Sequence, residues 1–400
     1  MTQPGRKKKI NFLFSDTGGG HRSSAQAIIE ALELEFPGFF ETQLIDIFHD
    51  YAPIPFRDAS RIYPRITRMP QVWEAGYRIS NSPRNAELLN QMTWPYIRRG
   101  AIKLVKQNPC DLFVSVHPLA NQAYLNVTAR QKFPFATVVT DMVSVHAFWF
   151  DPRADLVIVP TDDARTTGIQ HGMPADRIRV VGQPVAERFR VPAADRRSIR
   201  NEQGWQEDLP VILLVGGGEG MGPLERIAQA IDDARLPAQL AIIAGRNHSL
   251  QHRLEERQWQ IPVSVYGFVK NMPELMAASD ILVSKAGPGT ISEAFIAGLP
   301  MVLYARLPGQ EDGNVTYVTR SKAGVWAPEI NEVIMALRMW LDYPSARDEA
   351  SAASRRMARP EATRQIARLL KNRFFTPDEE NPIHGYFQLL PNPSGNSTGS

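Results

Sequence analysis

The chain has 400 residues, of which 43% are hydrophobic and 22% are charged. These values are typical of a globular protein with two or three domains. The net charge of +3 argues against a polycation that coats nucleic acid. The single cysteine, Cys110, allows neither an internal disulfide nor a zinc site built on cysteine pairs, and it favours a cytoplasmic location.

The sequence offers no segment that could cross a membrane. It contains no run of roughly 18 apolar residues, so a transmembrane helix is not expected. The basic N-terminus is followed by a short apolar run at residues 10–14, which is too short for the core of a signal peptide. Any contact with a membrane is therefore expected to be peripheral.

Short apolar strands alternate with helical segments in the first half of the chain. Residues 10–14 predict a buried strand, and residues 21–36 predict a helix with an apolar stripe. Further strands are predicted at residues 43–48, 111–117, 135–140, 155–160 and 180–181. Residues 191–209 are polar and irregular in pattern, and we expect a linker between two domains within them.

The same alternation begins again at Pro210. Strands are predicted at residues 211–215, 240–244, 263–268, 281–284 and 301–304. Helices are predicted at residues 224–234, 249–259, 273–278 and 291–297, and within residues 331–373. Strands that alternate with helices indicate a parallel, doubly wound sheet, so the expected fold class is α/β, with two such domains facing a cleft.

The first motif lies between the first strand and the first helix. Gly18, Gly19 and Gly20 allow a tight turn and a close approach of the backbone to a ligand, in front of a helix N-terminus. His21 follows at the carboxyl end of a strand, where α/β sheets place their ligands, and an imidazole there can act as a general base. The alternative is a turn without a ligand, with His21 as a hydrogen-bond partner at the helix start.

A second glycine-rich segment, residues 216–222, follows the first strand of the second half. It contains five glycines, among them Gly218, which is more than a simple turn needs. We interpret it as a phosphate cradle at a helix start. Neither glycine-rich segment matches the GxGxxG dinucleotide pattern, which argues against a nicotinamide-dependent oxidoreductase.

Residues 285–294 run from a strand through a Gly-Pro-Gly-Thr turn into a helix. Thr290 is expected to cap this helix, whose free N–H groups can hold a phosphate. Glu293 lies one turn further, where its carboxylate can accept two ribose hydroxyls. The alternative for Glu293 is a capping box with Thr290.

A fourth motif, residues 308–314, predicts a polar loop after the next strand. Gln310, Glu311 and Asn314 are side chains of types that bind hydroxyl groups. A solvated loop without a ligand is the alternative.

Residues 48–106 carry a local net charge of +6, with aromatic residues interleaved among the basic ones. Cations beside aromatic rings suit an anionic lipid surface. One alternative is a solvated helical face with core aromatics. Another is the binding of single-stranded nucleic acid.

These motifs, in this order, resemble the monogalactosyldiacylglycerol synthase family, nucleotide-sugar transferases that glycosylate diacylglycerol. The resemblance is carried by residues 15–21, 140–146, 215–223, 267–272, 285–293 and 308–314. It covers residues 10 to about 340. The sequence is also similar, more distantly, to the enzyme that adds N-acetylglucosamine to the undecaprenyl-linked peptidoglycan precursor.

The resemblance implies two Rossmann-like domains in the arrangement called GT-B. Residues 1–195 would form an acceptor and membrane-binding domain, and residues 205–345 a domain that binds the uridine diphosphate (UDP) sugar. Helices at residues 346–375 and a partly disordered tail at residues 376–400 would follow.

The resemblance also implies roles for single residues. His21 would be the catalytic base, and Asp141 a second catalytic candidate on the acceptor side. Gly18, Gly19 and Gly20 would form the acceptor loop. The implied donor-binding residues are Gly218, Gly289 and Thr290 for the pyrophosphate, Glu293 for the ribose, Phe268 and Val269 for the uracil, and Gln310, Glu311 and Asn314 for the sugar.

We therefore expect an inverting glycosyltransferase that moves a hexose, galactose, from its UDP donor to the free hydroxyl of diacylglycerol, giving a β-linked glycolipid. The alternatives are a glucose donor, another lipid acceptor, or a non-enzymatic nucleotide-sugar or lipid-binding protein. The UDP-sugar is a substrate, and no cofactor or metal is expected. The expected partners are the UDP-hexose, diacylglycerol and an anionic lipid surface, with no nucleic acid, at a cytoplasmic, peripherally membrane-associated location. The oligomeric state is left open.

Overall fold

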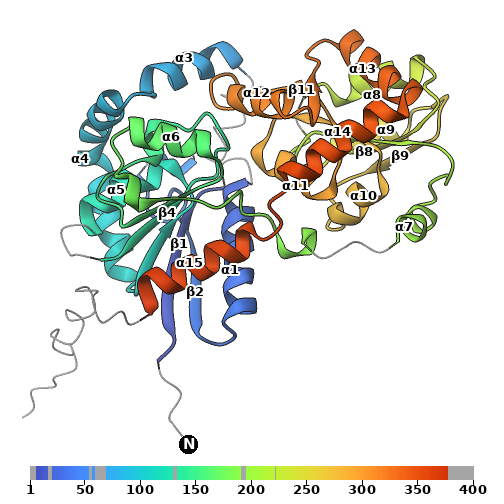
Figure 1. Cartoon of the computed structure of the whole chain (residues 1–400). Coiled ribbons are helices and arrows are strands. Elements are labelled where there is room, and N and C mark those ends of the chain that lie inside the picture. The colour runs from blue at the N-terminus through green and yellow to red at the C-terminus, as the bar shows by residue number, and fades with distance from the viewer. Residues whose placement is uncertain are drawn as a thin grey trace, which may run out of the picture.

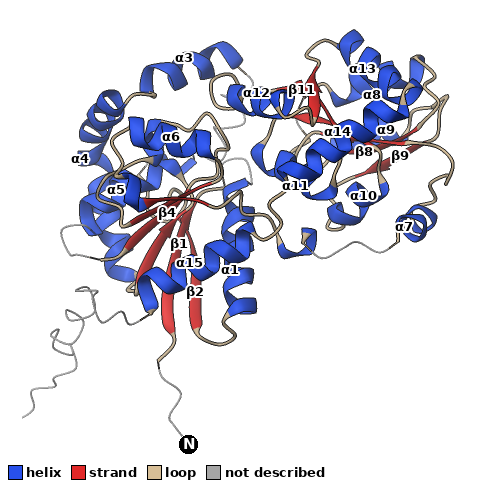
Figure 2. Cartoon of the chain, in the orientation of Figure 1, coloured by secondary structure: helices blue, strands red, loops and turns tan. Residues whose placement is uncertain are grey.

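The computed structural model describes residues 6–16, 20–53, 56–58, 69–128, 133–190, 195–220 and 222–376. They form two α/β halves, each built on a six-stranded parallel sheet with helices packed on it (Figures 1 and 2). The expected fold class, two parallel α/β units, is confirmed. The expected tail from residue 377 onward lies outside the described residues, as do Gly18 and Gly19.

The first half contains a sheet with the strand order β2-β1-β3-β4-β5-β6. Its strands are β1 (Lys8–Phe14), β2 (Phe40–Asp46), β3 (Leu112–Ser115), β4 (Phe135–Val138), β5 (Leu156–Val159) and β6 (Ile178–Val180). Its helices are α1 (Gly20–Glu35), α3 (Pro70–Ser80), α4 (Pro83–Gln107), α5 (Pro118–Thr128) and α6 (Asp162–Gln170). Short 3₁₀ turns are η1 (Phe56–Asp58), η3 (Ala147–Trp149), η4 (Ala175–Arg177) and η5 (Glu187–Phe189).

The second half contains a sheet with the strand order β12-β11-β10-β7-β8-β9. Its strands are β7 (Val211–Val215), β8 (Gln239–Ile243), β9 (Val263–Tyr266), β10 (Ile281–Lys285), β11 (Met301–Ala305) and β12 (Gly324–Trp326). Its helices are α7 (Arg196–Glu202), α8 (Leu224–Asp233), α9 (His248–Glu255), α10 (Met272–Ala278), α11 (Pro288–Ala297), α12 (Asp312–Arg320), α13 (Ile330–Asp342) and α14 (Pro344–Met357).

β3, β4, β5, β7 and β10 are largely apolar and buried, because helices cover both faces of each sheet. In β7, Ile212 and Leu214 pack into the core on one face, whereas Leu213 and Val215 pack into the core on the other. The strands of the first sheet also divide their side chains between two cores. Each half therefore has its own hydrophobic interior.

The segment expected to hold the linker contains a helix, α7, that its polar pattern does not reveal. The carboxylate of Asp195 caps this helix by accepting the N–H of Ser198 at 3.3 Å. Arg200 is buried and donates to the carbonyl of Ala278 at 3.0 Å and to Oδ2 of Asp280 at 2.7 Å. These contacts attach α7 to the second half, so the connection between the halves precedes Asp195.

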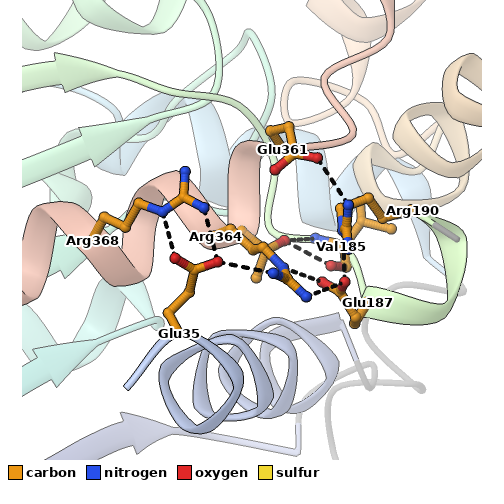
Figure 3. Close-up of polar contacts among 8 residues, drawn as sticks. Glu35, Val185, Glu187, Arg190, Glu361, Arg364 and Arg368 are labelled. Atoms are coloured by element: carbon orange, nitrogen blue, oxygen red, sulfur yellow. Dashed lines mark hydrogen bonds and ion pairs between the residues drawn. The ribbon is translucent and has the colours of Figure 1, made fainter. Parts of the chain in front are cut away.

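The last helix, α15 (Ala362–Phe375), returns to the first half and packs along α1 (Figure 1). Figure 3 shows that Arg364 attaches α15 to the first half. Its Nη1 donates to Glu35 of α1 at 3.0 Å, and its Nη2 donates to Glu187 of η5 at 2.7 Å. Arg368 binds the same Glu35 carboxylate, and these arginines hold the pKa of Glu35 below its usual value.

The two segments that connect the halves lie side by side. The hydroxyl of Thr363 donates to the carbonyl of Val185 at 2.6 Å and accepts the N–H of Val185 at 2.9 Å. Gly182 has no space for a side chain here, because a Cβ would lie 2.7 Å from the Cβ of Ala362. Both connections therefore cross between the halves at a single place.

Candidate active site

His21 lies in the first turn of α1, one residue after Gly20, where the carboxyl end of β1 leads into the helix. Its Nδ1 lies 2.8 Å from the carbonyl oxygen of Val116 and 3.0 Å from the hydroxyl of Thr140. Because a carbonyl can only accept, Nδ1 carries the proton and Nε2 keeps the lone pair. Burial lowers the pKa of His21 to about 4, so the ring is neutral near pH 7 and Nε2 can accept a proton.

Two further rings, those of His117 and Trp149, lie beside this histidine, and neither was among the predicted site residues. The ring centroid of His117 lies 4.6 Å from that of His21, and that of Trp149 lies 6.1 Å away. Burial also lowers the pKa of His117 well below its usual value, so the histidine pair is uncharged near neutral pH. His117 follows the carboxyl end of β3, the neighbour of β1, and that position is the signal that could have identified it.

Asp141 follows β4 and joins the histidine side of the site to the second half. Its Oδ2 accepts the indole N–H of Trp149 at 2.6 Å, and its Oδ1 accepts the amide N–H of Gln310 at 2.9 Å. Burial raises the pKa of Asp141 to about 6. Asp141 therefore links the indole beside His21 to the loop before α12.

Close packing at two glycines brings the halves together around this link. The N–H of Gly313 donates to the hydroxyl of Ser144 at 2.9 Å, and the hydroxyl of Tyr77 donates to the Ser144 carbonyl at 2.9 Å. A Cβ at Gly309 would lie 2.6 Å from Tyr77, and one at Gly313 would lie 2.6 Å from Val143. Larger residues at these two positions would push the halves apart.

Gln310 and Asn314 offer two acceptor oxygens in this region. The amide nitrogen of Gln310 donates to Asp141, and that of Asn314 donates to the carbonyl of Ala286 at 2.9 Å. Oε1 of Gln310 and Oδ1 of Asn314 are buried and have no hydrogen-bond partner among the described residues. Because buried acceptors in folded proteins almost always have partners, these two oxygens are suited to accept ligand hydroxyls.

The expected polar loop is shorter than predicted, because α12 begins at Asp312 and contains Asn314. Glu311 precedes the helix and is buried. Its Oε1 accepts from Nζ of Lys285 at 2.9 Å, and its Oε2 accepts the N–H of Leu307 at 2.8 Å. The Glu311 carboxylate thus fixes the loop to the end of β10.

The turn after β10 corrects two expectations. The cap of α11 is Gly287 rather than Thr290, because Pro288 has a backbone angle suited to the first helical position. Thr290 is the third residue of the helix, so the N–H groups of Gly289 and Thr290 lie in its first turn. The capping-box alternative for Glu293 is wrong, because the helix start lies too far upstream. Burial raises the pKa of Glu293 to about 7.

The glycine-rich turn after β7 also differs from the prediction. Gly218 does not lie at a helix N-terminus, because α8 begins only at Leu224. Gly217 and Gly220 adopt left-handed φ angles of 72° and 57°. A Cβ at Gly220 would lie 1.9 Å from the carbonyl oxygen of Ala244, so this position requires glycine. The N–H of Gly218 therefore belongs to a turn packed against the loop after β8.

That loop carries Arg246, which was not among the predicted site residues. The guanidinium of Arg246 lies over the ring of Phe268, 4.3 Å from its centroid. Phe268 is 52% exposed, whereas Val269 packs against the core. An arginine just beyond the carboxyl end of a strand is the only sequence signal for this position.

The expected donor-binding residues all lie beyond the carboxyl ends of second-half strands. Gly218 follows β7, Phe268 follows β9, Thr290 follows β10 and Gln310 follows β11. β11, β10 and β7 are neighbours in the sheet. Open α/β sheets bind ligands at this edge, and here it meets the first half through Gln310 and Asp141.

Solved structures share this architecture at low sequence identity. MurG from Acinetobacter baumannii superposes with a TM-score of 0.58 at 15% identity, covering 91% of this chain and 99% of that one. WaaG, a glycosyltransferase involved in lipopolysaccharide biosynthesis, gives a TM-score of 0.55 at 15% identity, covering 90% and 99%. The UDP-GlcNAc 2-epimerase from Neisseria meningitidis gives 0.60 at 14% identity, covering 91% and 100%.

The sequence comparisons are more specific. Residues 21–185 match the model of monogalactosyldiacylglycerol (MGDG) synthase, and residues 211–359 match the glycosyltransferase family 28 C-terminal domain. Monogalactosyldiacylglycerol synthase 1, chloroplastic, of Arabidopsis thaliana is 37% identical over 375 residues, covering 90% of this chain and 70% of that protein. The probable monogalactosyldiacylglycerol synthase, chloroplastic, of Glycine max is 36% identical over 392 residues, covering 93% and 73%.

The fold, the site and the matches together define a glycosyltransferase of GT-B architecture. The chain belongs to the monogalactosyldiacylglycerol synthase family. The resemblance and the class of enzyme expected from the sequence are both confirmed.

Proposed function

We propose that the protein transfers galactose from UDP-galactose to the free hydroxyl of diacylglycerol, with inversion at the sugar carbon. The observation that carries this proposal is the neutral His21, whose proton on Nδ1 leaves Nε2 as a base. Asp141 hydrogen-bonds both to Trp149 beside that histidine and to Gln310, whose buried Oε1 has no hydrogen-bond partner among the described residues. The names of the relatives support galactose and diacylglycerol as the substrates.

In the proposed reaction the acceptor hydroxyl attacks the anomeric carbon while Nε2 of His21 takes its proton. The bond from that carbon to the diphosphate oxygen breaks, and its electrons leave on UDP. A positioned base typically contributes about 10²–10⁴-fold to such a step. Direct displacement turns an α-linked donor into a β-linked product.

The departing diphosphate gains negative charge, which needs stabilisation. The N–H groups of Gly289 and Thr290 in the first turn of α11 are suited to this. Oδ1 of Asn314 and Oε1 of Gln310 would accept sugar hydroxyls. The proposal includes no metal ion or other cofactor.

The proposal is tested by incubating the purified protein with diacylglycerol and, separately, with UDP-galactose, UDP-glucose and UDP-N-acetylglucosamine. Mass spectrometry identifies the glycolipid, and the anomeric proton coupling gives its stereochemistry. We expect β-galactosyl diacylglycerol. A glucosyl product would replace the proposed sugar, and an α-linked product would contradict direct displacement.

We also propose that the enzyme works in the cytoplasm, bound peripherally to an anionic lipid surface through α3 and α4. No helix in the part of the chain that the structure describes is long and apolar enough to span a bilayer. Large apolar side chains are nevertheless exposed on these two helices and just before α3. They are Met69, Val72, Ile79, Leu88, Met92 and Tyr96.

On α4 the exposed apolar positions continue into basic ones along one face. Leu88, Met92 and Tyr96 recur at helical spacing and are followed by Arg99 and Lys103. Arg99 and Lys103 line a groove of about 770 Å³ together with Arg57. Apolar side chains next to cations suit an anionic bilayer.

The interleaved aromatic residues contribute less to this surface than their number suggests. Tyr77 is buried, and Phe48, Tyr51 and Trp94 pack against the core of the first half. Among the described aromatics of this region, Tyr96 is the one that stands out as exposed. Aliphatic side chains therefore carry most of the proposed contact.

Met92→Glu should lower binding to vesicles that contain anionic lipid by about tenfold, because a buried apolar side chain is worth roughly 1.5–3 kcal/mol. Co-sedimentation with vesicles of graded anionic content measures this. Met335→Glu is the matched control, because Met335 lies on α13 of the second half with the same 63% exposure. An equal loss of vesicle binding in both variants would contradict the proposed surface. So would vesicle binding that does not depend on the anionic lipid content.

A further inference from the structure

The side chain of Arg246 lies between the two ends of the expected donor site. Its Nη1 is 3.4 Å from the position that a Cβ on Gly218 would take, and its Cζ is 4.3 Å from the ring centroid of Phe268. Gly218 belongs to the expected phosphate end, and Phe268 to the expected base end. A nucleoside diphosphate that contacts both Gly218 and Phe268 would therefore lie against the guanidinium of Arg246.

The backbone around Arg246 is fixed directly to the glycine-rich turn. The N–H of Arg246 donates to the carbonyl of Gly218 at 2.9 Å. Gly245 has a φ of 61°, and a Cβ there would lie 2.5 Å from the same carbonyl oxygen. Asn247 adds a 3.3 Å hydrogen bond to the carbonyl of Gly220. The loop after β8 and the turn after β7 are thus packed backbone to backbone, which keeps the arginine beside the phosphate end.

The partner of this arginine comes from the same glycine-rich turn. Nη1 of Arg246 lies 2.7 Å from Oε1 of Glu219, and the two side chains are 52% and 41% exposed. Ion pairs exposed to this degree are weak, because solvent screens them. A guanidinium also matches phosphate oxygens in a two-point geometry, and charge-assisted contacts of that kind are among the stronger hydrogen bonds.

We propose that Arg246 binds the diphosphate of the nucleotide-sugar donor and that Glu219 holds the guanidinium until the donor replaces it. The proposal rests on the UDP-sugar donor of the proposed function. It adds a mobile positive charge to the N–H groups that face the leaving diphosphate. It also assigns Glu219 a role opposed to binding, since its carboxylate competes with the phosphates for the same cation.

The two residues give opposite expected results. Arg246→Ala should weaken UDP binding by about 10- to 100-fold, the range for a lost charge-assisted pair of hydrogen bonds, and should change uridine binding little. Arg246→Lys should bind UDP with an affinity between those of the wild type and Arg246→Ala, because lysine keeps the charge without the two-point geometry. Glu219→Gln should tighten UDP binding by about two- to fivefold, which is the range of an exposed ion pair. Isothermal titration calorimetry of the full chain with UDP and with uridine measures all of these.

A second arginine–glutamate pair of the same half provides the control. Arg253 of α9 and Glu225 of α8 lie 2.9 Å apart and are 49% and 42% exposed, nearly as the proposed pair is. Arg253→Ala and Glu225→Gln should leave UDP binding unchanged.

Three results would overturn the role of Arg246. These are unchanged UDP binding in Arg246→Ala, an equal loss for UDP and uridine, and weaker UDP binding in Glu219→Gln. A wild-type protein that binds neither UDP nor uridine would instead overturn the donor assignment, so the two failures are distinguishable.

Discussion

Replacing His21 by alanine is expected to lower kcat by about 10²–10⁴-fold, the usual contribution of a positioned general base. The affinity for UDP should stay unchanged, because the expected donor residues lie in the second half and His21 lies in the first. The loss follows from removing Nε2, the nitrogen that the hydrogen bond from Nδ1 to Val116 keeps unprotonated. Initial rates at saturating substrate, together with calorimetry of UDP binding, measure the two effects separately.

The pH profile provides an independent check on the same residue. Because burial lowers the pKa of His21 to about 4, the base stays unprotonated down to that pH. The kcat/KM of the wild type should therefore lose no activity to His21 protonation near pH 6.5, and that loss should appear only as the pH falls toward about 4. His252→Ala, which removes an exposed histidine of α9, serves as the control and should leave the rate unchanged. Near-normal turnover in His21→Ala would remove this residue from the mechanism.

Glu293→Gln is expected to weaken UDP binding by about 10- to 100-fold, because the amide replaces one of the two acceptor oxygens by a donor group and removes the negative charge of the carboxylate. Calorimetry with UDP and with 2′,3′-dideoxy-UDP tests this assignment. The wild type should lose affinity when the ribose hydroxyls are absent, whereas the variant should bind both ligands about equally. A variant that still distinguishes the two ligands as the wild type does would place the ribose elsewhere.

The same substitution should change stability in the opposite direction. Burial raises the pKa of Glu293 to about 7 from the ordinary value of 4.5, so the folded state holds this proton more tightly than the unfolded chain does. The resulting stabilisation is complete below the unfolded pKa and is lost as the pH rises through about 7. At about pH 8 the ionised carboxyl should cost roughly 1–3 kcal/mol of unfolding free energy, which Glu293→Gln recovers. Urea unfolding at about pH 8 and pH 4 checks this difference.

Regular apolar runs predicted the strands well, and tertiary contacts explain the elements that were missed. The strand at residues 211–215 has the predicted bounds, because a strand buried on two faces is a continuous apolar run. α7 was not predicted, because the residue that attaches it to the second half is the buried Arg200. The hydrogen-bond partners of Arg200 lie far away in the sequence. α12 begins at Asp312, within a segment whose sequence is typical of a polar loop, and no local sequence pattern predicts this helix start.

The position of the site followed from glycine-rich turns after strands, but its chemistry depends on distant partners. The sequence places His21 at the end of a strand, yet its tautomer depends on Val116, which is far away in the chain. Thr290 was expected to cap α11 because its hydroxyl suits that role, whereas Pro288 starts the helix earlier. Arg246 belongs to no recognisable sequence motif. Its position beside the expected phosphate end becomes evident only from the packing of its loop onto the glycine-rich turn.

The pairing of Thr363 with Val185 has a mechanical consequence for turnover. Two chain connections that run side by side and are hydrogen-bonded to each other are suited to act as one hinge, about which the halves would rotate rather than slide. Opening about such a hinge would separate Gln310 from Asp141 and Gly313 from Ser144, the contacts that join the halves beside the site. In the proposed reaction, lipid entry and UDP release would then require the hydrogen bond at Gln310 to break. The other amide atom of Gln310, Oε1, has no hydrogen-bond partner among the described residues and is the proposed acceptor of a sugar hydroxyl.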